Sequence, residues 1–190
     1  DSIDLALKLV LSKYSRIDGL VNNAYPRTKD WGCMFEDIPF DSWRKNIDWQ
    51  LNSYFYLTQK VVSQMSYQNF GSIINMTSIY GVVGPDFTVY DGTSMTMPAA
   101  YSAIKGALVS FTRYVASYYG PRNVRVNAIS PGGIFDNQND VFQESYCKKV
   151  PMRRLGSPED ISPSVAFLLS EDAKYITGQN LIIDGGWTAI

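Results

Sequence analysis

Residues 72–78 of the chain read Ser-Ile-Ile-Asn-Met-Thr-Ser, a short apolar stretch that ends in hydroxyl side chains. A run of this length and composition is typical of a buried strand in a parallel sheet. Residues 124–130 form a second such run, and residues 17–23 and 181–184 form shorter ones. The sequence therefore predicts four strands.

Between these strands lie stretches with apolar residues at helical spacing. We expect helices from the opening residues to about Ser15, over residues 41–65, over residues 99–119 and over residues 158–169. Asp41 or Ser42 would cap the second helix, and Ser157 is a natural N-cap for the last one. This alternation predicts an α/β fold, a doubly wound parallel sheet with helices on both faces.

Composition narrows the class of protein. With 190 residues, of which 45% are apolar and 18% are charged, the chain has the size of one soluble domain. Its net charge of −1 and the lack of a basic stripe point to no nucleic acid and no membrane as partner. No apolar run approaches the ~20 residues of a membrane span. Cys33 and Cys147 lie far apart and suit reduced thiols in the cytoplasm.

The chain contains no histidine, and this limits the chemistry it can perform. Ser-His-Asp and Cys-His catalysis are excluded, and the commonest metal ligand is missing, so we expect no metal site. Acid and base chemistry must use other side chains.

The strongest local signal is Tyr101-Ser-Ala-Ile-Lys105 in the predicted helix 99–119. Residues four apart lie on one helix face, so the ammonium group lies beside the phenol. A free tyrosine titrates near ~10, and a neighbouring positive charge stabilises its anion, as proton transfer near neutral pH requires. On many helices such a pair contributes little, so its surroundings decide its meaning.

The predicted strands end in polar or glycine-rich turns. Asn22-Asn23-Ala24, Ser78 and the turn of residues 130–133, Ser-Pro-Gly-Gly, all follow strands. In open α/β sheets, ligands bind outside the carboxyl ends of the strands. Each turn alone has an ordinary reading as a loop, but their shared edge favours a binding site.

Together with the ending Asp184-Gly185-Gly186, these motifs resemble the short-chain dehydrogenase/reductase family in order and character. The resemblance covers the whole chain and implies an oxidoreductase that moves a hydride between NAD or NADP and a secondary alcohol or ketone. It implies that Tyr101 is the general acid/base, that Ser78 orients the substrate oxygen and that Lys105 binds the nicotinamide ribose and lowers the tyrosine pKa. The cofactor-binding residues that it implies are Asn22, Ala24, Tyr101, Lys105, Pro131, Gly132 and Ile134.

The chain departs from the family pattern at several positions. The family usually has a helix asparagine that holds a water for proton relay, and the pattern W-x6-N-L from Trp43 puts Gln50 there. Gln50 keeps the carboxamide, so we retain it as a catalytic candidate. Tyr25 stands where the family usually has glycine, and Asp136 lies in a turn that commonly carries threonine.

An insertion separates Ser78 from Tyr101. Residues 85–98 exceed the usual spacing of the family, and we expect them to form a loop over the site. This loop and the two turns resemble the flagellin-modification oxidoreductase subgroup, which is linked to bacterial sugar biosynthesis. Stacking and hydrogen-bonding groups in the loop, such as Phe87, Asp86 and Thr93, suit a sugar derivative, although a solvated loop explains them equally well. Candidate substrate-binding residues are Tyr80, Tyr90 and Asp91.

No glycine-rich phosphate-binding turn precedes Asn22, so the resemblance implies that residues 1–190 are the C-terminal portion of one short-chain dehydrogenase domain whose first three strands and their helices are missing. NAD and NADP cannot be distinguished, because the selecting residue lies in that missing part. A homodimer or homotetramer is implied. Two alternatives stay open: a truncated, non-catalytic binding or structural subunit, and an epimerase or dehydratase of the same fold.

Overall fold

A parallel sheet forms the centre of the protein. The computed structural model describes residues 2–190, and its strands are β1 (Gly19–Asn22), β2 (Gly71–Met76), β3 (Val124–Pro131) and β4 (Asn180–Ile183). They pair in that order, every pair parallel, in one four-stranded sheet. The four predicted strands are confirmed, each to within a few residues. Parallel pairing brings all four carboxyl ends to one edge.

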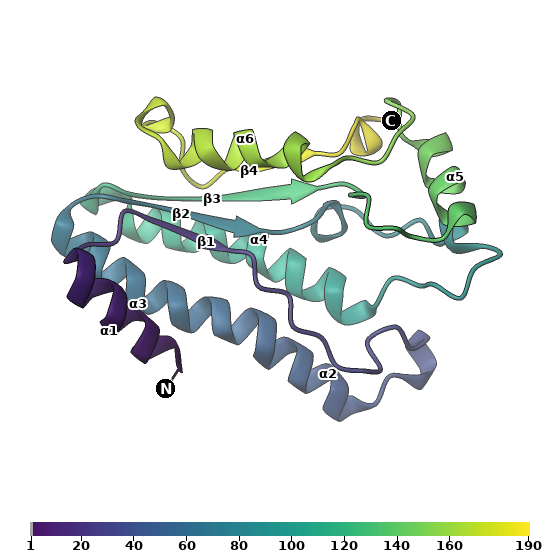
Figure 1. The fold of residues 1–190 in the computed structure, drawn as a ribbon, viewed down its shortest axis with the longest axis horizontal. Helices are drawn as coiled ribbons and strands as arrows, with labels where there is room; N and C mark the ends of the chain where they lie inside the picture. The colour runs from purple at the N-terminus through teal and green to yellow at the C-terminus, as the bar shows by residue number, and fades with distance from the viewer. Residues whose placement is uncertain (1) are drawn as a thin grey trace.

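Helices cover both faces of the sheet (Figure 1). The helices α1 (Ser2–Tyr14), α3 (Ser53–Gln68) and α4 (Ala99–Tyr119) lie on one face, and α6 (Pro158–Leu169) lies on the other. A fifth helix, α5 (Asp140–Lys149), lies beyond the carboxyl ends of the strands. The doubly wound α/β class is therefore confirmed. Within the described residues, no helix combines the length and apolar character that crossing a membrane requires.

The strands alternate their side chains between two apolar clusters. Ile73 and Val126 point toward α3 and α4, where they pack with Met65. Ile74 and Ile129 point the other way and pack with α6. These five side chains are essentially inaccessible to solvent. Burial of each such side chain contributes about 1.5–3 kcal/mol, which holds the helices against the sheet.

The predicted helix over residues 41–65 is longer and less regular than its sequence indicates. It consists of α2 (Phe40–Ile47), a π-helical turn η2 (Asp48–Asn52) and α3, and it ends at Gln68. Neither Asp41 nor Ser42 is its N-cap, because Pro39 takes that position. The Ser42 hydroxyl instead donates to Asp30 at 2.7 Å. A π-helical turn inside an α-helix often occurs at a functional site.

Helix α5 was not predicted. Its sequence is polar overall, and only Phe142 and Tyr146, one helical turn apart, are buried. Asn139 caps its start by accepting a hydrogen bond from Val141 N–H at 2.9 Å. The helices predicted over residues 99–119 and 158–169 have the expected boundaries. Ser157 precedes α6 as expected, and its N–H donates to the Asp160 carboxylate at 2.8 Å.

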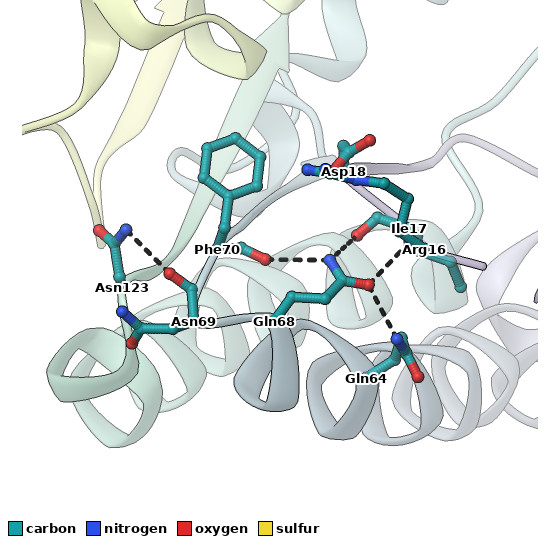
Figure 2. A network of polar contacts seen from close by, with 8 residues as sticks. All are labelled: Arg16, Ile17, Asp18, Gln64, Gln68, Asn69, Phe70 and Asn123. Atoms are coloured by element: carbon teal, nitrogen blue, oxygen red, sulfur yellow. Dashed lines mark hydrogen bonds and ion pairs between the residues drawn. The ribbon is translucent and has the colours of Figure 1, made fainter. Parts of the chain in front are cut away.

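The strand β1 is anchored near its start by one side-chain amide (Figure 2). Gln68 Nε2 donates to Ile17 O at 2.8 Å, and Gln68 Oε1 accepts from Ile17 N–H at 2.9 Å. Gln64 Nε2 donates to the same Gln68 oxygen at 2.9 Å. Gln68 thus binds both backbone groups of Ile17, as a neighbouring strand would, and joins the end of α3 to the strand.

Replacing Gln68 with leucine is expected to destabilise the protein by about 1–3 kcal/mol, because both backbone groups of Ile17 lose their partner. Urea denaturation followed by circular dichroism measures this change. Gln59→Leu is the matched control, since Gln59 lies exposed on the same helix. An equal loss of stability in the two variants would contradict the role of Gln68.

Candidate active site

A cleft of about 690 Å³ opens at the carboxyl edge of the sheet. Its walls come from the segments that follow β1, β2 and β3, from the start of α4, from α5 and from the insertion at residues 85–98. All of these segments except α5 were predicted to meet, and they do. The predicted site residues that line the cleft are Ser78, Tyr80, Tyr90, Tyr101, Lys105, Pro131, Gly132 and Ile134.

Tyr101 and Lys105 lie together on the first turns of α4. Lys105 is 6% exposed, and its Nζ lies 5.4 Å from the centre of the Tyr101 ring. The same Nζ donates to Met76 O, at the end of β2, at 2.9 Å. Burial lowers the pKa of Lys105 to about 8. The ammonium group is therefore held in place by a strand end rather than by solvent.

Ser78 lies beside this pair. It lies two residues after the end of β2, and its Oγ accepts a hydrogen bond from Tyr80 N–H at 3.2 Å at the start of the short 3₁₀ turn η3 (Ile79–Gly81). Burial raises the pKa of the Tyr101 phenol, and the Ser78 hydroxyl opposes that shift. The predicted trio of Ser78, Tyr101 and Lys105 is thus assembled in one place.

The arrangement around Lys105 fits the ribose of a nicotinamide cofactor. An ammonium group carries three N–H donors, and Met76 O accepts from one of them. The remaining donors can bind the hydroxyls of a sugar at the cleft. Pro131, Gly132 and Ile134 form the adjoining wall, and a Cβ atom on Gly132 would lie 2.8 Å from Asp184 Cα. Only glycine keeps this turn close against the end of the sheet.

The side chains of Asn22 and Ala24 do not line the cleft. Asn22 is 2% exposed, and its Nδ2 donates to Asn75 Oδ1 at 2.8 Å and to Thr58 Oγ1 at 3.1 Å. Ala24 O accepts from Tyr54 Oη at 2.9 Å. The next asparagine, Asn23, lines the cleft instead. Asn22 therefore ties β1 to β2 and α3 behind the site.

Gln50 also points away from the cleft. It is buried in the π-helical turn η2, and its Nε2 donates to Pro26 O at 2.8 Å. Tyr25, the residue before Pro26, lines the cleft. The Gln50 side chain thus supports the loop after β1, so its contact with the site is indirect.

The insertion at residues 85–98 borders the cleft, as expected, but through other residues than its sequence indicates. Tyr90 lines the cleft, whereas Asp91 is exposed outside it. Asp86 forms an ion pair with Lys149 of α5. The other cleft-lining residues of this loop are Met95, Thr96 and Met97. The polar groups that suggested a sugar therefore lie elsewhere.

Aromatic stacking attaches this loop to α5. The ring of Tyr90 stacks on Phe142 at 5.4 Å between ring centres, and Tyr146 stacks on Trp187 at 4.4 Å. Tyr146 Oη also accepts from Gly133 N–H at 2.6 Å. Tyr80 and Tyr90 are both buried, and burial raises the pKa of each phenol. One wall of the cleft is therefore largely aromatic.

Sequence reasoning missed several residues that line the cleft. Asn23 and Tyr25 belong to the turn after β1, which the sequence predicts to lie at the site. Which residues of this turn face the cleft depends on where β1 ends. Phe142 and Tyr146 lie on the helix that was not predicted, and their spacing of four residues was the available signal. The remaining missed residues lie at and just after the end of β2, in the inserted loop, in the turn after β3 and at the start of α6.

The family model described as enoyl-(acyl carrier protein) reductase matches residues 1–188. The chain belongs to the short-chain dehydrogenase/reductase family, whose members are NAD(P)-dependent oxidoreductases acting on small molecules. The resemblance that the motifs suggested is therefore confirmed.

Individual relatives differ in what they act on. Post-translational flagellin modification protein A of Campylobacter coli is 36% identical over 188 residues, which are 98% of this chain and 73% of that protein. The 7alpha-hydroxysteroid dehydrogenase of Bacteroides fragilis is 33% identical over 187 residues, 96% of this chain and 68% of that protein. A short-chain dehydrogenase of Leptospira borgpetersenii, solved with bound NAD+, is 36% identical with a TM-score of 0.89; the match covers 98% of this chain and 70% of that one.

Gly81→Ala is expected to displace Ser78 from Tyr101, because a Cβ at Gly81 would lie 2.6 Å from the Lys105 carbonyl carbon and 2.8 Å from Gly106 N. Such overpacking costs typically about 1–3 kcal/mol. The melting temperature, measured by thermal denaturation, and the turnover rate should both decrease. Gly84→Ala is the control, since nothing lies within 4 Å of a Cβ there. A Gly81→Ala protein as active and stable as the control would contradict the packing of η3 on α4.

Proposed function

We propose that the chain carries the catalytic part of an oxidoreductase that interconverts a secondary alcohol and a ketone with NAD or NADP. The observation that carries the proposal is the placement of Tyr101 beside both Ser78 and the buried ammonium group of Lys105 in one cleft. Acid/base chemistry by tyrosine needs both a stabilising charge and a group that orients the substrate oxygen.

In the proposed direction of alcohol oxidation, the Tyr101 phenolate accepts the proton of the substrate hydroxyl. The Ser78 hydroxyl donates a hydrogen bond to the oxygen as it becomes a carbonyl oxygen. A nicotinamide cofactor held by Lys105 would supply the hydride chemistry at the alcohol or ketone carbon. In the reverse direction, the Tyr101 phenol gives its proton back to the oxygen.

Lys105 has two proposed roles. Its positive charge favours the phenolate form of Tyr101, whose pKa burial alone would raise. Its free N–H donors would hold the ribose hydroxyls of the cofactor, and Pro131, Gly132 and Ile134 would form the adjoining wall of the cofactor site. Asn22 and Ala24 contribute through the backbone of their turn, since neither side chain reaches the cleft. The choice between NAD and NADP stays open.

The proposed substrate is a secondary alcohol or a ketone. The hypothesis of a sugar derivative rests on the likeness to the flagellin modification protein and on polar residues of the insertion. Those polar groups, Asp86 and Asp91, lie outside the cleft, and Tyr80 and Tyr90 are the substrate-binding candidates that line it. Met95 and Met97 add apolar surface that suits an apolar portion of the substrate.

We also propose that the protein acts as a homo-oligomer in the cytoplasm. Aromatic side chains are exposed along the outer faces of α3 and α4, including Phe55, Tyr114 and Tyr118, and they line a shallow groove. Contact with a second copy would remove this surface from water. The thiols of Cys33 and Cys147 are free, as suits a reducing compartment.

The described residues are proposed to form the C-terminal portion of a longer short-chain dehydrogenase domain. Val21 of β1 is 39% exposed at the edge of the sheet. A chain extended upstream by its parent gene is expected to bind NADH or NADPH more tightly than the 190-residue chain. Quenching of cofactor fluorescence measures both affinities. Binding by neither form would favour the alternative of a non-catalytic subunit.

Tyr101→Phe is expected to lower turnover by roughly 10²–10⁴-fold while leaving the fold intact, because only the transferable proton is lost. Steady-state kinetics with NADH or NADPH and a ketone measure the loss. Tyr67→Phe is the matched control, since Tyr67 is 89% exposed and remote from the cleft. Near-normal turnover in Tyr101→Phe would exclude the proposed mechanism.

A further inference from the structure

Two aromatic residues lie against the catalytic pair without a place in the proposed mechanism. Tyr25 follows β1, and the centre of its ring lies 5.6 Å from that of Tyr101, edge to face. Trp31 lies behind both rings, 5.7 Å from Tyr25 and 6.4 Å from Tyr101. Tyr25 is the residue that replaces the usual glycine of the family pattern.

Tyr25 also contacts the buried ammonium group. Lys105 Nζ lies 5.6 Å from the centre of the Tyr25 ring and 5.4 Å from that of Tyr101. The ammonium group is thus flanked by two aromatic rings, with Met76 O as its hydrogen-bond acceptor. A cation within about 6 Å of a ring centre is attracted by the electrons of the ring, and the attraction grows as water is excluded.

This attraction matters because the charge of Lys105 has little other support. No carboxylate forms an ion pair with it among residues 2–190. Burial favours the neutral amine and lowers its pKa to about 8. An amine that lost its proton would stop stabilising the Tyr101 phenolate. Ring faces and one carbonyl are therefore the groups that favour its charged form.

We infer that Tyr25, backed by Trp31, is a positioning residue that keeps Lys105 charged and oriented beside Tyr101. The inference rests on the proposed function and gives the departure from glycine a role. Tyr25 acts through Lys105, so its effect should appear in the protonation of that amine as well as in turnover.

Other titratable groups near the amine do not account for its state. Burial raises the pKa of the Tyr101 phenol on the same helix and of the Tyr25 phenol on the neighbouring loop, so burial disfavours a phenolate that would stabilise the ammonium group. Arg27 lies 5.0 Å from the Tyr25 ring. The cleft wall adds Tyr80, Tyr90 and Tyr146, whose phenol pKa burial also raises, and the carboxylate of Asp136.

The test compares Tyr25→Leu, which keeps bulk but removes the ring, with Tyr25→Phe, which keeps the ring. The full chain is labelled with acetic anhydride between pH 6 and 10, and mass spectrometry follows acetylation of Lys105, with exposed Lys13 and Lys29 as internal references. In Tyr25→Leu the pH at which acetylation of Lys105 is half-maximal should be lower than in the parent protein. The expected shift corresponds to a roughly threefold to tenfold change in the protonation equilibrium of the amine. Tyr25→Phe should match the parent protein.

An unchanged midpoint in Tyr25→Leu, or one that moves to higher pH because water enters, would overturn the inference. A shift of equal size in Tyr25→Phe would overturn it too, since the ring is then not the cause. Tyr25→Met serves as a second variant without a ring should Tyr25→Leu fold poorly. Because labelling needs no turnover, its result is separate from that of Tyr101→Phe. A failure of the proposed function would appear in the turnover of Tyr101→Phe, and a failure of this inference would appear in the labelling midpoint of Tyr25→Leu.

Discussion

A buried positive charge is the constraint on which the site depends. Placing an ammonium group out of water is costly unless polar groups receive it, and Lys105 is 6% exposed. An ion pair with a carboxylate would offset that cost most directly. The carboxylate would, however, also neutralise the positive charge that is proposed to stabilise the Tyr101 phenolate. The protein instead uses the Met76 carbonyl and two ring faces. These groups support the ammonium while leaving its charge available to the phenol.

The fold supplies each of these groups through a different strand connection. β2 ends at Met76, so its last carbonyl points at α4, and Ser78 follows within two residues. The register of β1 with β2 places Asn22 opposite Asn75, so β1 ends beside the end of β2. Tyr25 follows three residues after Asn22 and lies at the same edge of the sheet. Buried hydrogen bonds from Asn22 to Asn75, and from Asn75 to Thr112 of α4, hold the two strands and the helix together. The alignment of strand ends therefore sets the distances in the cleft.

Much of this arrangement could be predicted from sequence because it follows from local periodicity. The apolar strand 72–78, the helix 99–119 and the spacing of Tyr101 and Lys105 each depend on nearby residues only. The direction of Gln50 could not be predicted, because the π-helical turn alters the rotation of the helix at that residue. Helix α5 was missed since two buried aromatics are a weak signal in a polar segment. Which of Asn22 and Asn23 faces the cleft could not be predicted, because it depends on where β1 ends.

The insertion at residues 85–98 shows why the polarity of a loop predicts its role poorly. One of its two charged groups, Asp86, serves as a partner for Lys149, and its Thr93 hydroxyl donates to Tyr90 O at 2.7 Å. These contacts turn polar groups back onto the protein and leave Met95 and Met97 to face the cleft. The stack of Tyr90 on Phe142 then couples the insertion to α5, and Tyr146 couples α5 to the turn after β3. Contacts therefore run from the insertion through α5 to Gly133, so side-chain packing links the proposed substrate wall to the proposed cofactor wall.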